Sequence, residues 1–213
     1  MLRFVIAAAI AAAAIPAQAQ FYWKPADVFG PPLLTYEPGM GVALPGATPA
    51  EQKAAIIWNM RAGLNVAALQ CGFEPTLRTL ENYNAILGNH TAELGASFNT
   101  LSAYFKRTNK TAALGQKQLD TFGTRTYSGF STVQSQLEFC ATAGRVGRIG
   151  LFTPRGKFVT FAEEHLRELR NALARTGEQQ FRFAQPYRLA VLPVFDERCW
   201  KKNKYNYACG YSS

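Results

Sequence analysis

Residues 75–107 read PTLRTLENYNAILGNHTAELGASFNTLSAYFKR, and this stretch decides the fold class. Its apolar side chains recur at steps of three and four residues, from Leu77 to Phe105. That spacing places them on one face of an α-helix. Pro75 suits the first position of a helix, so we expect one continuous helix of about 50 Å, at 1.5 Å per residue.

The sequence on either side of this stretch predicts three further helices. Upstream, Thr48-Pro49-Ala50-Glu51 has the threonine cap, the first-position proline and the third-position glutamate of a helix start. Downstream, a third apolar stripe covers residues 114–140, where Gly123 and Gly129 favour a kink or a break. A fourth helix is expected over residues 157–175.

We therefore predict an all-α fold, an antiparallel up-and-down helix bundle over residues 48–178, with two long central helices joined by a tight turn near Asn109. Residues 20–47 hold five prolines, which oppose regular helix, and several aromatic side chains that need a surface to cover. We expect an extended arm lying over the bundle. A flexible arm that binds a partner is the alternative.

Residues 1–19 have the pattern of a cleavable signal peptide. A positive charge at Arg3 is followed by an alanine-rich apolar run and then by Ala17-Gln18-Ala19, with small residues at the positions that a signal peptidase reads. We expect cleavage before Gln20 and an exported protein, periplasmic or extracellular. An uncleaved N-terminal anchor is the alternative, but the apolar run is shorter than the ~20 residues that span a bilayer. No segment after Gln20 is apolar for that length either.

Four cysteines follow the signal peptide, and an even number in an exported protein favours two disulfides. The first helix ends at Cys71, the second runs away from that end, and the third returns, so Cys140 comes back to the level of Cys71. The remaining pair, Cys199 and Cys209, then closes a small hairpin in the tail. A zinc site is the rival use of four cysteines, but the sequence has no Cys-x-x-Cys pair.

The positive charge is concentrated near the C-terminus. The chain carries a formal charge of +9, and residues 145–213 hold thirteen Lys and Arg against six Asp and Glu. Within the tail, residues 179–213, cations alternate with aromatic side chains at Arg198, Trp200, Lys201, Lys202, Lys204, Tyr205 and Tyr207. We expect this group to contact an anionic polymer, anionic lipid headgroups or an envelope protein. A solvated basic surface is the alternative.

Few residues in the sequence suggest catalysis. His90 lies on the apolar stripe with Glu93 three residues later, which favours a buried, hydrogen-bonded histidine. There is no Gly-x-Ser-x-Gly and no Cys-x-x-Cys-His, and we predict no cofactor and no metal. The expected function is that of a non-enzymatic binding or scaffold protein. The alternative is an envelope enzyme that acts on a polymer or lipid with carboxylates in a groove, such as Glu81, Glu93 or Asp120.

One further motif has regular glycines and arginines, the stretch GRVGRIG at residues 144–150. Its backbone N–H groups and two guanidinium groups suit an anion. A helix end followed by a flexible turn explains the same residues.

Overall fold

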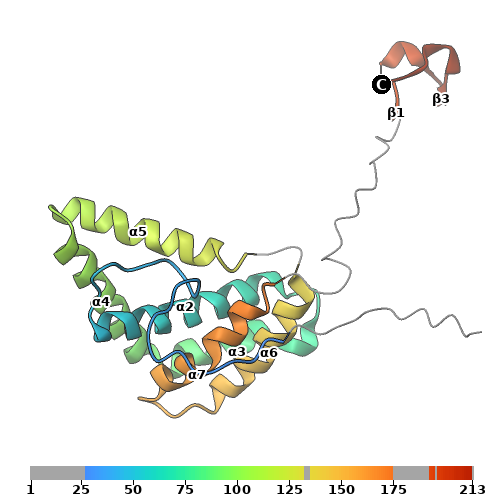
Figure 1. Cartoon of the computed structure of the whole chain (residues 1–213). Helices are drawn as coiled ribbons and strands as arrows, with labels where there is room; N and C mark the ends of the chain where they lie inside the picture. The colour runs from blue at the N-terminus through green and yellow to red at the C-terminus, as the bar shows by residue number, and fades with distance from the viewer. Residues whose placement is uncertain (1–26, 132–134, 175–191, 195, 213) are drawn as a thin grey trace, which may run out of the picture. The chain divides into compact units, whose positions relative to one another are not determined.

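The computed structural model describes residues 27–131, 135–174, 192–194 and 196–212. The expected signal peptide lies outside these ranges. The chain divides into two compact units, residues 1–180 and 181–213, and the first contains the helices (Figure 1). They are α2 (Pro49–Gln70), α3 (Thr79–Asn89), α4 (Thr91–Thr108), α5 (Ala112–Ser128), α6 (Gln136–Leu151) and α7 (Phe158–Asn171). The prediction of an all-α bundle is confirmed.

Helix α2 occupies the middle of the bundle and contacts each of the helices α3 to α7. It starts as predicted: the Thr48 hydroxyl accepts a hydrogen bond from the Glu51 N–H, and the Glu51 carboxylate accepts one from the Thr48 N–H. Arg107 at the end of α4 donates to the same carboxylate at 2.7 Å. Because α2 is surrounded by other helices, small and apolar residues are buried on most of its faces.

The single helix expected over residues 75–107 is divided into three pieces. A 3₁₀ turn, η1 (Pro75–Leu77), precedes α3, and α3 ends at Asn89. The break lies at His90, where the backbone has φ −114° and ψ 23°. As a result, α3 packs on α6 and α2, while α4 packs on α5 and α2. The tight turn near Asn109 is present between α4 and α5, which pack against each other.

The stripe over residues 114–140 is also divided, in the region where a break was expected. Helix α5 ends at Ser128 and Gly129 caps it, with its N–H bonded to the carbonyl of Arg125. Phe130 follows and is fully buried. Helix α6 then begins at Gln136. Both helices pack on α2, but α5 also packs on α4, whereas α6 packs on α3 and α7.

The motif at residues 144–150 lies inside helix α6, so the prediction of a flexible turn is wrong, and its backbone N–H groups are part of the helix. Its glycines face η1 and α3 instead. A Cβ atom on Gly144 would lie 3.1 Å from Cβ of Leu77, and one on Gly150 would lie 2.7 Å from Cδ1 of Ile86. The motif therefore allows close packing of two helical segments.

Residues 27–47, the described part of the predicted arm, lie over the bundle. Leu33 is completely buried, and its N–H donates to the carbonyl of Glu163 in α7 at 2.7 Å. Glu37 forms a two-oxygen contact with Arg167 at 2.9 Å. Tyr36 accepts a hydrogen bond from the amide of Asn59 in α2 at 2.9 Å. Residues 20–26 of the predicted arm lie outside the described ranges.

The first disulfide joins Cys71, at the end of α2, to Cys140, near the start of α6. This is the pair that the helix directions predict, but the route of the chain differs. Cys140 was expected at the end of a returning helix, whereas that helix ends at Ser128 and Cys140 lies in a new helix that begins at Gln136. In the described ranges, no helix is long and apolar enough to cross a membrane.

The second unit is a small structure closed by the disulfide between Cys199 and Cys209. Strands β2 (Trp200–Lys201) and β3 (Lys204–Tyr205) form an antiparallel hairpin. The N-terminal strand β1 (Leu192–Pro193) pairs with β4 (Tyr211–Ser212) in the same way. Two single 3₁₀ turns, η3 (Glu197–Cys199) and η4 (Tyr207–Cys209), carry the cysteines. The predicted disulfide-closed hairpin is confirmed.

Candidate functional site

The tip of the β2–β3 hairpin presents the predicted lysines to solvent. Lys202 and Asn203 form the turn and both have positive φ angles, 48° and 62°, as a tight two-residue hairpin turn requires. Lys201 and Lys204 are opposite each other on the two strands. All three lysines are exposed, and none forms an ion pair with any residue that the structure describes.

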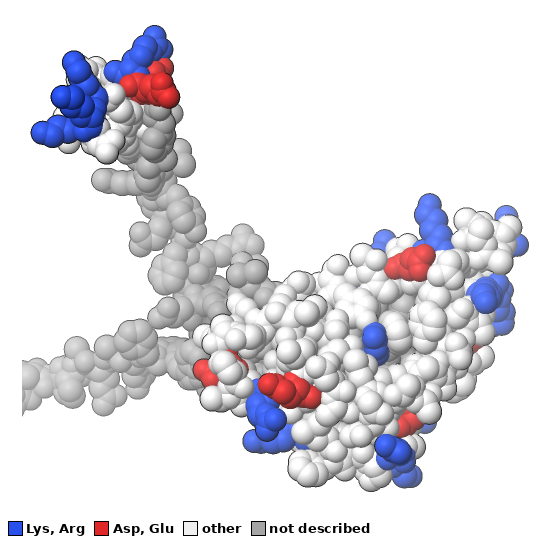
Figure 2. All heavy atoms as spheres, turned by 180° about the vertical axis from the view of Figure 1, so that it is seen from behind, with Lys and Arg blue, Asp and Glu red and all other residues white. Residues whose placement is uncertain are grey.

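Arg198 differs from these lysines because its charge is already paired. Its guanidinium donates to both oxygens of Asp196, with the shortest contact at 2.7 Å. Hydrogen bonds from Arg198 hold the pKa of the Asp196 carboxyl below its usual value. In Figure 2, one side of this unit shows only basic side chains, and its acidic side chains appear on the other side. Among the residues of this unit that the structure describes, the unpaired positive charge is therefore that of the three lysines.

The aromatic side chains of this unit have two different environments. The ring centroids of Trp200 and Tyr205 lie 5.1 Å apart, and Trp200 Nε1 donates to the Val194 carbonyl at 3.0 Å. The Tyr205 hydroxyl donates to the Gly210 carbonyl and accepts from the Val194 N–H, so this side chain holds the unit together. Tyr207 is 75 % exposed. Of the aromatic side chains whose exposure the structure describes in this unit, Tyr207 and the outer part of Trp200 are the ones that a partner can reach.

In the bundle, His90 is buried and hydrogen-bonded, as predicted. Its Nδ1 atom lies 2.7 Å from Glu93, its ring packs on Phe158 with centroids 4.8 Å apart, and Nε2 has no partner among the described residues. Burial by itself would raise the pKa of Glu93. Hydrogen bonds from His90 and from the N–H groups of Phe158 and Gly156 outweigh burial and lower this pKa. Glu93 thus has the properties of a structural carboxylate.

The other two carboxylates of the enzyme hypothesis are on the surface. Glu81 is exposed in the first turn of α3. Asp120 is exposed on α5 and accepts a hydrogen bond from Gln116 at 2.9 Å. A carboxyl group that acts as general acid in glycoside or ester hydrolysis needs a raised pKa. The pKa of Glu93 is lowered instead. These three residues therefore offer no support for the enzyme hypothesis.

Arg170 is a partly buried cation that sequence reasoning did not identify. Its guanidinium lies 3.7 Å above the Phe130 ring and donates to the Asn59 side chain at 2.6 Å and to the Gly129 carbonyl at 3.1 Å. Burial lowers the pKa of Arg170 to about 10 and raises that of the neighbouring Tyr36 to about 12. These contacts join α7 to α2 and to the Gly129–Phe130 segment after α5, which indicates a structural role.

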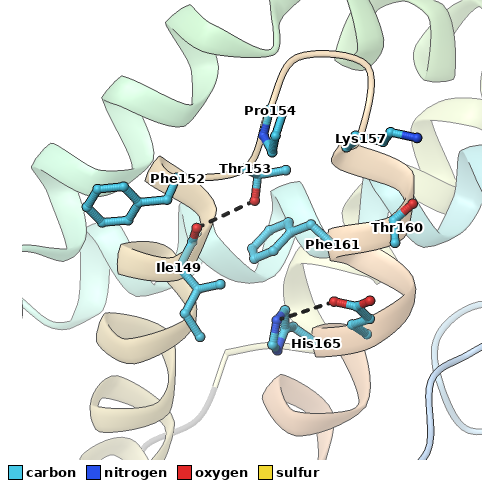
Figure 3. A pocket seen from close by; sticks show the side chains of 9 residues that line it. Ile149, Phe152, Thr153, Pro154, Lys157, Thr160, Phe161 and His165 are labelled. Atoms are coloured by element: carbon cyan, nitrogen blue, oxygen red, sulfur yellow. Dashed lines mark hydrogen bonds and ion pairs between the residues drawn. The ribbon is translucent and has the colours of Figure 1, made fainter.

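A pocket of about 440 Å³ lies between the end of α6 and α7 (Figure 3). Phe161 projects from α7 towards the end of α6, and His165 follows about one turn further along α7. The His165 ring has Glu168 at 3.2 Å, and Glu168 in turn accepts from Arg145 at 2.5 Å. The sequence did not indicate this pocket because its walls come from two helices and the loop between them.

Residues of the described ranges include no group of three or more His, Cys, Asp or Glu side chains arranged to hold a metal ion. Comparison of the chain with protein families, with curated proteins and with solved structures found no match. Any function must therefore be argued from the surface chemistry of the chain itself.

Proposed function

We propose that the chain is an exported, non-enzymatic binding or scaffold protein that contacts an anionic partner through its C-terminal unit. The supporting observation is the group of three exposed lysines, Lys201, Lys202 and Lys204, which have no acidic partner in the described residues. The disulfide between Cys199 and Cys209 holds the turn that carries them. We call this group the lysine tip.

A fixed tip favours binding because less conformational entropy is lost when a partner binds. Two of the lysines are opposite each other across the hairpin and the third is in the turn, so their charges are concentrated on a few residues. Such a cluster attracts polyanions and accelerates their association. The exposed Tyr207 ring packs against Tyr205, the residue after Lys204, and suits a partner with flat groups or sugar rings. An anionic polymer therefore fits better than a small inorganic ion.

Export is the second part of the proposal. Both disulfides suit an oxidising compartment, and residues 1–19 have the pattern of a cleavable signal peptide. Intact-mass measurement of the protein recovered from the cell envelope or medium tests this part. We expect a chain that starts at Gln20. A mass that retains residues 1–19 would refute cleavage.

The binding part is tested by replacing all three lysines of the tip with glutamine. We expect weaker retention on immobilised heparin and elution at lower salt, because the variant has lost three positive charges. Salt is the right variable for this test, since exposed charges are screened over ~10 Å at 0.1 M ionic strength. The melting temperature of the bundle should stay the same, since exposed charges contribute little to stability. Vesicles containing phosphatidylglycerol, tested in parallel, distinguish a lipid surface from a polymer.

A matched control removes three lysines from the bundle. Lys106, Lys110 and Lys117 are exposed on and between α4 and α5, and their replacement by glutamine lowers the net charge equally. This control should retain heparin binding. If both triple variants lose the same retention, only net charge matters. If neither does, the lysine tip has no role in binding.

A further inference from the structure

A pocket of about 430 Å³ lies where α6 faces η1 and the start of α3, and the proposed function does not use it. Its volume is in the range of small-molecule sites. None of the described residues that line it is acidic, and three of them are arginines, Arg78, Arg145 and Arg148. The arginines of the glycine–arginine motif are therefore part of its wall.

The three arginines are not equivalent. Arg145 is already engaged, since it donates to Glu168 and its guanidinium lies 5.0 Å from the centre of the Phe29 ring. Arg78 and Arg148 are exposed, and neither forms an ion pair with a residue in the described ranges. The pocket therefore has two guanidinium groups available for an anion. We refer to Arg78 and Arg148 as the arginine pair.

The backbone positions this pair. Arg78 adopts a left-handed conformation, with φ 49°, in the single residue between η1 and α3. Arg145 and Arg148 are three residues apart on α6, so they share a helix face. Gly144 lets η1 approach that face, because a Cβ there would lie 3.1 Å from Leu77. The glycines of the motif thus bring Arg78 to the same pocket as Arg148.

Two acidic residues lie close to Arg78 in the sequence, Glu74 and Glu81, and neither is among the described residues that line the pocket. Glu74 is exposed, and its Oε1 atom accepts hydrogen bonds from both the N–H and the hydroxyl of Thr76. These bonds lower the pKa of Glu74, so its charge remains with Thr76. The arginine pair is left for a ligand.

The other wall of the pocket is apolar. Leu77 and Leu151 are partly buried and pack against the core, whereas Phe152 at the end of α6 is 82 % exposed. A phenyl ring with that exposure leaves apolar area that a ligand can cover, and removing that area from water favours binding. The pocket therefore offers guanidinium groups and apolar surface together.

We propose that this pocket binds an anionic amphiphile, a molecule that joins a phosphate or carboxylate to an apolar body. Guanidinium groups bind both oxyanions through paired N–H donors, which is stronger and more directional than an ammonium contact. The apolar body would lie against Phe152 and Leu151. The proposal uses no residue of the lysine tip and does not rest on the proposed function.

The test uses dodecyl phosphate, kept below its micelle concentration, as the probe, with calorimetry on the full mature chain. The variant pairs Arg78→Asn, since asparagine tolerates the left-handed conformation, with Arg148→Gln. We expect the affinity to decrease about tenfold or more, because two charge-assisted contacts are lost. The control variant, Lys106→Gln with Arg125→Gln, removes two exposed charges elsewhere and should bind as the wild type does.

Two further probes separate the parts of the ligand. Inorganic phosphate tests the anion alone and should bind more weakly than dodecyl phosphate. Dodecyl maltoside has the same chain without the charge and should also bind more weakly. Phe152→Ala should weaken dodecyl phosphate and leave inorganic phosphate unchanged. Equal affinity for the two phosphates would refute the apolar half of the proposal.

The lysine tip is a second cationic group, so all measurements are repeated in the chain that carries the three Lys→Gln replacements. Binding that persists there and is lost with the arginine pair supports the pocket. Binding that is lost with the lysine tip and unaffected by the arginine pair overturns it. If the double variant does not fold, Arg148→Gln alone decides, since Arg148 is exposed and glutamine is a good helix former.

Discussion

The Nδ1 atom of His90 lies 2.7 Å from Oε2 of Glu93, and the same carboxylate accepts hydrogen bonds from the N–H groups of Phe158 at 2.7 Å and Gly156 at 3.0 Å. Helix α7 has no side-chain cap from Lys157, the residue before it. Glu93 supplies that cap from another helix and places a negative charge at the positive end of α7. His90 orients the carboxylate, so the break between α3 and α4 is linked to the start of α7.

Replacing His90 with alanine should lower the free energy of unfolding by about 1–3 kcal/mol, since packing is lost and Glu93 loses a partner. Denaturant unfolding measures this change. Asn89→Ala is the control, because Asn89 is exposed one residue away. A variant with the wild-type unfolding midpoint and altered partner binding would instead indicate a ligand role for His90.

Glu93→Gln should make stability less dependent on acid pH. The pKa of Glu93 is lowered in the folded state from its ordinary value of 4.5, so its stabilisation is complete above pH 4.5 and is lost as the pH falls below that value. We expect the variant to be about 1–3 kcal/mol less stable at pH 7, with a smaller difference near pH 3. Thermal unfolding of both proteins across this range measures it. A constant difference would mean that Glu93 acts only by packing.

Two helix glycines should respond in opposite directions to alanine. A Cβ on Gly115 would lie 2.8 Å from the carbonyl oxygen of Phe105, a backbone atom of the neighbouring helix, so Gly115→Ala should destabilise the bundle by about 1–3 kcal/mol. A Cβ on Gly95 would meet nothing within 4 Å. Gly95→Ala should therefore stabilise α4 by roughly 0.5–1 kcal/mol. Thermal unfolding of the two variants measures these effects. A lower melting temperature for Gly115→Ala and a higher one for Gly95→Ala would support the close approach of α4 and α5.

The two disulfides should stabilise different parts of the chain. Cys71 and Cys140 are 69 residues apart, and a closed loop of that length corresponds to roughly 4 kcal/mol in the chain-entropy account. A variant with both cysteines replaced by alanine should unfold at a much lower temperature. The same replacement of Cys199 and Cys209 should leave the bundle transition unchanged, because they belong to the second compact unit. A large shift of the bundle transition in that variant would contradict this division.

Local sequence determined the features that depend on neighbouring residues. Four features could be predicted in this way: the capping box at Thr48, the apolar stripes, the turn near Asn109 and the proline-rich arm. Each depends on side chains a few residues apart that form hydrogen bonds with each other or share a face. The cysteine pairing was also predicted, although the path between Cys71 and Cys140 was not.

Tertiary structure alone decided the features that need a distant partner. The stripe continues in phase through Leu87, His90 and Leu94, so periodicity could not reveal that one residue redirects the chain. The glycines at 144–150 are typical of a turn in the sequence, whereas in the structure they lie in a helix with η1 and α3 packed against them. In the same way, Arg78 and Arg148 share a pocket only because those glycines allow two segments to approach. A pattern along the chain specifies which face is apolar, and only packing specifies what that face meets.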